Sequence, residues 1–233
     1  RDRVINPPGE AREDLEIIND LGKALGLDWN YNHASEVFNE MSKVMPSLNN
    51  ISWERVEKED SVTYPCDDKN LPGNEIVFSQ NFPTSSGLAK IVPTDLISPH
   101  ELPDQNFPFV LTTGRLLEHW HTGAMTRRSN TLDNIEPEAI VNMNRLDMKN
   151  LKLEPGNKVQ VKTRRGSIEL SVRQDTELPK GMIFIPFCFS EAAANKLTNP
   201  QLDPFGKIPE FKYCAANIEA CLLYTSPSPR DTG

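Results

Sequence analysis

The stretch LTTGRLLEHWHTGAMTRR, residues 111–128, combines side chains that suit the binding of a large anionic ligand. Gly114 lets backbone N–H groups approach a ligand closely, and Arg115 presents a planar set of donors that matches phosphate oxygens. Two histidines can each donate a ring N–H, and Trp120 between them offers a flat apolar surface for stacking. The stretch therefore predicts a binding loop for an anion that carries a heteroaromatic ring.

Parts of this stretch also allow simpler interpretations. His119 and His121 could be zinc ligands, but no cysteine pair at ligand spacing lies nearby, so we do not expect a metal site. Arg127 and Arg128 alone would usually lie on a solvated helix face. We expect Thr122 to cap a short helix that carries both arginines.

A strand must hold this loop, and an apolar run predicts one directly before it. Phe109–Thr113 has the character of a buried strand that ends at the loop. Four later segments are also predicted strands: Ala139–Met143, Lys158–Thr163, Ser167–Val172 and Met182–Pro186. Between two of them, Arg164-Arg165-Gly166 predicts a tight hairpin whose arginines are solvated turn residues. The pattern alone indicates a small closed β-barrel.

The first part of the chain has a different pattern. Residues 11–25 have apolar side chains at helical spacing, which predicts an amphipathic helix packed against a sheet outside this chain, and 37–45 predicts a second helix. Prolines then divide the chain into short extended pieces, with a hairpin expected between 75–78 and 89–92. We expect four segments: a helical remnant of an α/β domain at 1–50, a Pro-rich connection at 51–105, the barrel at 106–220, and a tail at 221–233.

Composition limits the class of protein. The chain has 233 residues, 37% hydrophobic content and a formal charge of −8, which suits one or two domains and disfavours nucleic acid as a partner. No apolar run has bilayer length, so we expect no membrane span. The chain begins at Arg1 and no leader follows, so a targeting signal is either absent or lost with an N-terminus outside this sequence. Cys66, Cys188 and Cys214 contain no CxxC pair. Free thiols favour a reducing compartment, and we expect a cytoplasmic location.

The tail CLLYTSPSPRD resembles the translation of a transposon-type sequencing adapter. A disordered Pro/Ser-rich tail is the alternative, and both interpretations exclude residues 221–233 from the fold.

The loop sequence TTGRLLEHWHTGAMTRR is similar to the C-terminal cofactor-binding loop of the dimethyl-sulfoxide-reductase superfamily. It most resembles the catalytic (alpha) subunit of molybdopterin-dependent formate dehydrogenase. EAAANKLTNP and LDPFGKIPEFKYCA extend this resemblance, which runs from about Ile5 to Glu219. The implied fold is mixed but mainly β: a six-stranded double-psi barrel that binds a molybdopterin dinucleotide, preceded by a helical and irregular remnant of an α/β domain.

The resemblance also implies a set of site residues. We expect the cofactor to contact Thr113, Gly114, Arg115, Leu116, Leu117, Glu118, His119, Trp120, His121, Thr122, Asn195 and Lys212. Phe187 would line the substrate path, although an ordinary core aromatic is an equally good interpretation. We expect no catalytic residue and no metal ligand in this chain.

The implied cofactor is molybdenum or tungsten bis-molybdopterin guanine dinucleotide. The implied reaction oxidises formate to carbon dioxide, and electrons pass through a [4Fe-4S] cluster in an N-terminal part outside this chain to other electron-transfer subunits. This fragment would hold the cofactor and be inactive alone. The alternatives are a fragment of a nitrate reductase catalytic subunit and a non-catalytic nucleotide-binding barrel.

Overall fold

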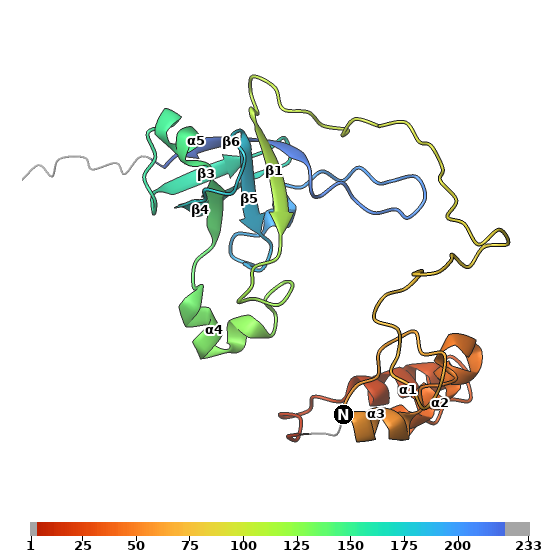
Figure 1. The fold of residues 1–233 in the computed structure, drawn as a ribbon. Helices are drawn as coiled ribbons and strands as arrows, with labels where there is room; N and C mark the ends of the chain where they lie inside the picture. Colours follow the sequence, from red (N-terminus) through yellow and green to blue (C-terminus); the bar gives the residue numbers. More distant parts are fainter. Residues whose placement is uncertain (1–3, 222–233) are drawn as a thin grey trace, which may run out of the picture. The chain divides into compact units, whose positions relative to one another are not determined.

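The computed structural model describes residues 4–221, and contacts divide the chain into one unit up to Pro93 and a second from Thr94 onward (Figure 1). Residues 94–105, predicted as part of the connection, are grouped with the barrel because Glu101 and Asp104 form ion pairs with Arg164 and Arg165. The finer segment boundaries remain predictions. Except for Cys221, the predicted adapter tail lies outside the described residues.

The first unit contains the two predicted helices and one further helix. α1 spans Asp14–Ala24 and α2 spans Ala34–Val44. A 3-10 turn, η1, covers Pro46–Leu48, and α3 spans Trp53–Glu59 within the stretch predicted to be extended. The sequence does contain a start signal for α3, because the Ser52 hydroxyl accepts a hydrogen bond from the Arg55 N–H at 3.1 Å.

The prediction of a hairpin between residues 75–78 and 89–92 is wrong. Neither piece forms a strand. Ile76 is 76% exposed and Ile91 is 90% exposed, so no neighbouring element covers the apolar face that would stabilise a pair of strands. Phe78 also has φ +58°, which interrupts an extended backbone.

The second unit is a closed barrel of six strands (Figure 1). Its strands are β1 Phe109–Gly114, β2 Ile140–Met143, β3 Lys158–Lys162, β4 Ser167–Gln174, β5 Met182–Pro186 and β6 Cys214–Ala220. The strand order is β1-β5-β2-β4-β3-β6. β1 pairs in parallel with β5, and β2 pairs in parallel with β4. The expected mainly β fold with a six-stranded barrel is confirmed.

Alternating apolar residues close the barrel around one core. Leu111, Val141, Val159, Ile183 and Ile185 have no exposed side-chain surface. A short helix, α5, spans Arg145–Asn150 after β2, and Asn144 caps it by accepting the Leu146 N–H. The hairpin between β3 and β4 is also confirmed, because the Thr163 N–H donates to the Gly166 carbonyl at 2.9 Å.

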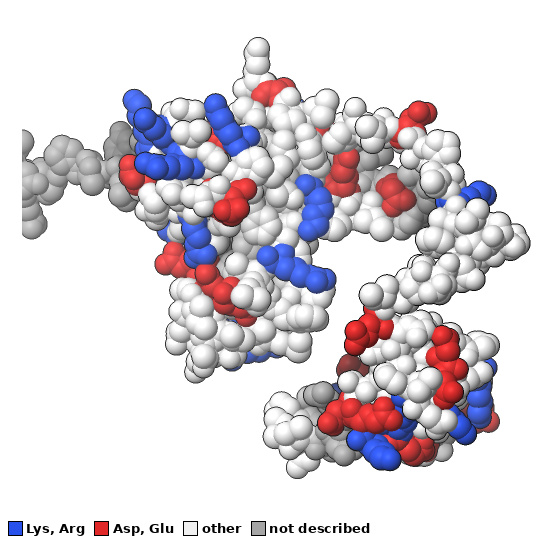
Figure 2. All heavy atoms as spheres, in the orientation of Figure 1, with Lys and Arg blue, Asp and Glu red and all other residues white. Residues whose placement is uncertain are grey.

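The binding stretch leaves β1 at one end of the barrel. Residues 115–125 form a loop, followed by a 3-10 turn, η2, at Thr126–Arg128 and by α4, Asn130–Ile135 (Figure 1). Figure 2 shows both signs of charge on the visible face of each unit. No helix among residues 4–221 is long and apolar enough to cross a membrane.

Candidate functional site

Two residues at the end of β1 determine how the loop begins. Thr113 is buried, and its hydroxyl donates to the Phe211 carbonyl at 3.0 Å. A Cβ atom at Gly114 would lie 2.5 Å from a ring carbon of Phe184, so only glycine fits without displacing that ring. The Phe187 N–H donates to the Gly114 carbonyl at 3.2 Å, which joins the loop to the end of β5.

The binding loop, residues 115–128, lines a pocket of about 600 Å³. Its lining residues are Arg115, Leu116, Leu117, Glu118, His119, Trp120 and His121, together with Thr126 and Leu132. Trp120 is 59% exposed, and its ring meets that of His121 edge to face at a centroid distance of 4.6 Å. The loop therefore has exposed aromatic surface beside the pocket, and its use by a ligand remains a prediction.

His119 has a different environment from its neighbour. It is only 1% exposed, and its Nε2 lies 2.8 Å from the Glu136 carbonyl oxygen. A carbonyl can only accept, so Nε2 carries a hydrogen, and Nδ1 forms a hydrogen bond with the Thr126 hydroxyl at 3.3 Å. That hydroxyl oxygen accepts the Trp120 N–H at 3.0 Å. The His119 ring thus anchors the loop, with both ring nitrogens already engaged.

The arginines of the loop divide into paired and unpaired residues. Arg127 bonds to Asp133 at 2.7 Å and to Glu191 at 2.7 and 2.9 Å, and its guanidinium lies over the ring of Phe189. Within residues 4–221, Arg115 has no ion-pair partner and is exposed. Arg115 is therefore the pocket-lining cation that remains available to an anionic ligand.

The helix that Thr122 was predicted to cap does not form. Thr122 is exposed, and the following residues make only the 3-10 turn η2, which begins after Met125 without a side-chain cap. The positive φ of Gly123, +74°, turns the chain immediately after Thr122, so its hydroxyl has no helical N–H groups to accept from.

The structure brings one of the two distant cofactor candidates to the loop. The Lys212 ammonium donates to the Thr113 carbonyl at 2.8 Å, so its charge lies where the loop begins. Asn195 is exposed on a second 3-10 turn, η3 Ala194–Lys196, and no hydrogen bond joins it to the loop among the described residues. Phe187 is half-buried and packs against the barrel core, which its core interpretation predicts; its place on a substrate path remains a prediction.

Metal-ligand chemistry has little support in this part of the protein. Residues 4–221 contain no group of three or more His, Cys, Asp or Glu side chains that could hold a metal ion. Burial raises the pKa of Cys188 to about 11, so this residue is a neutral thiol near neutral pH. Cys188 therefore has the character of a structural cysteine.

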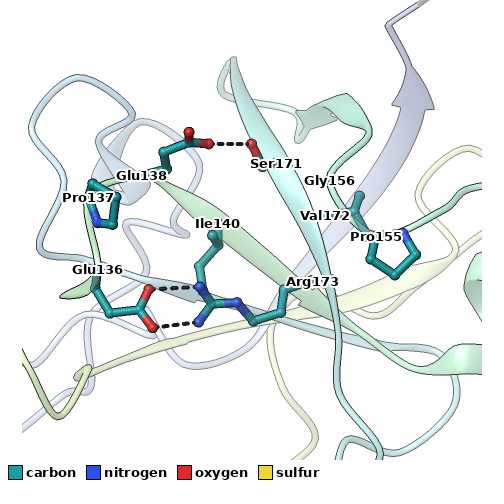
Figure 3. A pocket seen from close by; sticks show the side chains of 9 residues that line it. All are labelled: Glu136, Pro137, Glu138, Ile140, Pro155, Gly156, Ser171, Val172 and Arg173. Carbon is teal, nitrogen blue, oxygen red and sulfur yellow. Dashed lines mark hydrogen bonds and ion pairs between the residues drawn. The ribbon is translucent and has the colours of Figure 1, made fainter. Parts of the chain in front are cut away.

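A second hollow, of about 300 Å³, lies beside the paired strands β2 and β4 and is also lined by residues 136–138 and 155–156 (Figure 3). Its charged side chains already have partners: the Arg173 guanidinium donates two hydrogen bonds to Glu136, at 2.7 and 2.9 Å, and Glu138 accepts the Ser171 hydroxyl at 3.1 Å. These contacts leave no unpaired charge lining the hollow, so the loop pocket is the better candidate site.

The sequence-based prediction is wrong for one of the two turn arginines, Arg165, whereas Arg164 is exposed as expected. Arg164 and Arg165 were expected to be solvated, yet Arg165 is 22% exposed and forms a two-pronged ion pair with Glu101 at 2.5 and 3.0 Å. Arg164 pairs with Asp104 and lies over the ring of Phe107. The partners are about 60 residues earlier in the chain, and no local pattern could have revealed the pairing.

Comparison with known proteins agrees with this geometry. Residues 109–215 match the family described as Molydopterin dinucleotide binding domain. The chain is 44% identical over 219 residues to the F420-dependent formate dehydrogenase subunit alpha of Methanocaldococcus jannaschii, which covers 93% of this chain and 32% of that protein. It is 31% identical over 220 residues to the assimilatory nitrate reductase catalytic subunit of Bacillus subtilis, covering 91% of this chain and 31% of that protein.

The fold also matches a solved structure. Acetylene hydratase from Pelobacter acetylenicus superposes with a TM-score of 0.66 at 20% identity, over 94% of this chain and 34% of that chain. The chain spans about a third of the length of the relatives it matches. Residues 109–215 thus match the molybdopterin dinucleotide-binding domain family, within a chain that is similar to formate dehydrogenase alpha subunits along nearly its whole length.

Proposed function

We propose that this chain is part of the catalytic subunit of a molybdenum- or tungsten-dependent formate dehydrogenase. Its barrel would hold the bis-molybdopterin guanine dinucleotide cofactor. The pocket formed by the binding loop carries the proposal, because it combines the free cation Arg115, the exposed ring of Trp120 and a volume of about 600 Å³. When bound, the cofactor would supply the redox chemistry, and the chain would supply binding and orientation.

The residues of the loop pocket fit such a group. Arg115 would bind a phosphate oxygen through its planar donors, and Lys212 adds a second positive charge at the start of the loop. Trp120 and His121 offer faces and edges for a heteroaromatic ring. The carboxylate of Glu118 also lines the pocket and would repel a phosphate, so we place the phosphates toward Arg115 and a ring edge toward Glu118.

His119 would act indirectly on the cofactor. Because both its ring nitrogens are engaged by Thr126 and Glu136, we assign it the holding of the loop between Trp120 and η2. Leu116 and Leu117 would supply apolar contact, and Thr122 and Asn195 are exposed polar groups that could reach a ligand.

Formate is proposed as the substrate because the relative with 44% identity is a formate dehydrogenase, whereas the nitrate reductase relative has 31% identity. Oxidation of formate yields carbon dioxide, one proton and two electrons. The name of the first relative makes F420 a deazaflavin acceptor to test beside an artificial dye. Nitrate reduction, which would consume two electrons, is the second candidate.

The longer protein that contains this chain should therefore be purified and analysed for metal, nucleotide and activity. We expect molybdenum or tungsten by mass spectrometry, GMP after acid release of the cofactor, and formate-dependent reduction of F420 or a viologen dye. Nitrate-dependent oxidation of reduced dye without formate oxidation would show that the protein is a nitrate reductase and not a formate dehydrogenase. A correctly folded protein with neither metal nor guanine would refute cofactor binding.

A further inference from the structure

Two carboxylates, those of Glu101 and Asp104, bind a short segment before β1 to the barrel. Glu101 is only 12% exposed, and its carboxylate accepts from the Arg165 guanidinium at 2.5 and 3.0 Å. The same carboxylate accepts the Ala215 N–H at 2.7 Å, at the beginning of β6. The hydrogen bond from Arg165 is the main cause that lowers the pKa of Glu101, so this carboxylate is ionised near neutral pH.

Arg165 joins this carboxylate to the turn that carries Asn195. While its two terminal nitrogens bind Glu101, its Nε donates to the Leu197 carbonyl at 2.9 Å. Leu197 directly follows η3, on which Asn195 lies. One guanidinium therefore determines where the end of η3 lies against the β3–β4 hairpin.

A second link joins the Asn195 turn to the segment that carries Lys212. The Asn199 side chain donates to Glu210 at 2.9 Å, and the Asn199 N–H donates to the Cys214 sulfur at 3.0 Å. Glu210 also accepts the His100 N–H, with both carboxylate oxygens at 3.1 Å. His100 and Glu101 thus contact Glu210 and the beginning of β6 directly. They are linked to the turn that carries Asn195 only through Arg165 and Asn199.

We propose that Glu101 and Arg165 form a positioning pair that holds the segments carrying Asn195 and Lys212 in place for the cofactor. The pair need not touch the ligand. It acts because a planar guanidinium can bind a carboxylate and a carbonyl at once. Removal of the Glu101 charge leaves Arg165 without its carboxylate partner, and removal of Arg165 leaves Glu101 with the Arg164 ion pair at 3.3 Å but without a link to the Leu197 carbonyl. This inference rests on the proposed function for its purpose, but its structural part can be tested separately.

The test uses the full chain with substitutions on both sides of the pair. Glu101→Gln removes the charge but keeps an acceptor for the Ala215 N–H, and Arg165→Ala removes both contacts. Arg165→Lys keeps the charge but can reach only one of the two acceptors. Lys162→Gln is the matched control, because it breaks a different ion pair, with Glu219 at 2.5 Å, close to the same hairpin.

Amide hydrogen exchange would report the position of the segments without any ligand. In Glu101→Gln and Arg165→Ala we expect exchange roughly tenfold faster in residues 194–199 and 210–215, since a hydrogen bond to a charged group contributes enough for such a change. Arg165→Lys should recover part of the protection. Lys162→Gln should leave both segments unchanged. Faster exchange confined to residues 98–104, or spread evenly over the barrel core, would overturn the positioning role.

Binding of GDP, a fragment of the cofactor, gives the second measurement, by isothermal titration calorimetry. We expect roughly tenfold weaker binding in Glu101→Gln than in the unmodified chain and Lys162→Gln. Unchanged affinity alongside faster exchange would show that the pair does not position a binding group. If the unmodified chain fails to bind GDP, that result counts against the proposed function, while the exchange pattern still decides whether the pair holds the two segments.

Discussion

Trp120→Leu tests the binding loop most directly. Trp120 and His119 are adjacent, yet one ring is 59% exposed and the other 1% exposed. If Trp120 is held out for a ligand, replacing its flat ring with a branched apolar side chain should weaken ligand binding and change the stability of the fold very little.

The magnitudes follow from the burial of the ring. About two-fifths of Trp120 is covered, and leucine can keep much of that apolar contact, so we expect a loss of less than about 1 kcal/mol in the free energy of unfolding. Stacking of a base on an aromatic side chain contributes roughly 1–3 kcal/mol. Loss of that term should weaken GDP binding by roughly 5- to 150-fold.

Isothermal titration calorimetry with GDP gives the affinity, and urea denaturation of the same samples gives the free energy of unfolding. Trp120→Phe is the control, because it keeps an aromatic face and should bind nearly as well as tryptophan. A loss of more than about 2 kcal/mol in stability with unchanged affinity would show that Trp120 is a packing residue and refute our reasoning.

Four further predictions follow from contacts at and near the site. His119→Ala should lower the free energy of unfolding by about 2–4 kcal/mol, because it removes two hydrogen bonds from a buried ring; a loss below 0.5 kcal/mol in urea titration would be inconsistent with an anchor. Gly114→Ala should lower the free energy of unfolding by about 1–3 kcal/mol. The double variant with Phe184→Leu should lose less stability than the sum of the two single losses, since the smaller side chain leaves room for the added methyl group. Lys212→Glu should weaken GDP binding by reversing the charge beside Thr113, and equal affinity would remove Lys212 from the site. Folding raises the pKa of Cys188 from 9.0 to about 11, so the stability that its thiol contributes is complete below pH 9 and is lost as the pH rises toward 11. Cys188→Ala should therefore reduce the fall in the free energy of unfolding between these pH values. The same fall in the variant would contradict this prediction.

Local sequence predicted most of the barrel. Five strands were predicted within a residue or two, because each has either a run of apolar residues or apolar residues that alternate with polar ones, bounded by turn or polar residues. β6, Cys214–Ala220, has no such signal: its first residues are small, and neighbouring strands supply their burial. The hairpin predicted between 75–78 and 89–92 failed for the opposite reason, because local strand character had no neighbour to cover it.

The chemical character of the binding loop was also evident in the sequence. Its glycine, rings and cations predicted an anion- and ring-binding pocket; Arg115 and Trp120 line a pocket in the structure, and what it binds remains a prediction. Which members of the loop remain available to a ligand was not evident. His119 and Trp120 are neighbours with similar binding chemistry, but the Glu136 carbonyl and the Thr126 hydroxyl engage only the histidine.

The sequence by itself determined the strand periodicity, the position of the loop and the kinds of group it offers, because these depend on residues close together in the chain. Only the tertiary structure decided which charges are free and which are engaged. Arg165 would be an ordinary turn residue without Glu101, and Lys212 an ordinary surface lysine without the Thr113 carbonyl. Closure of the barrel brings these pairs together across 64 and 99 residues, and no local pattern encodes contacts at such separations.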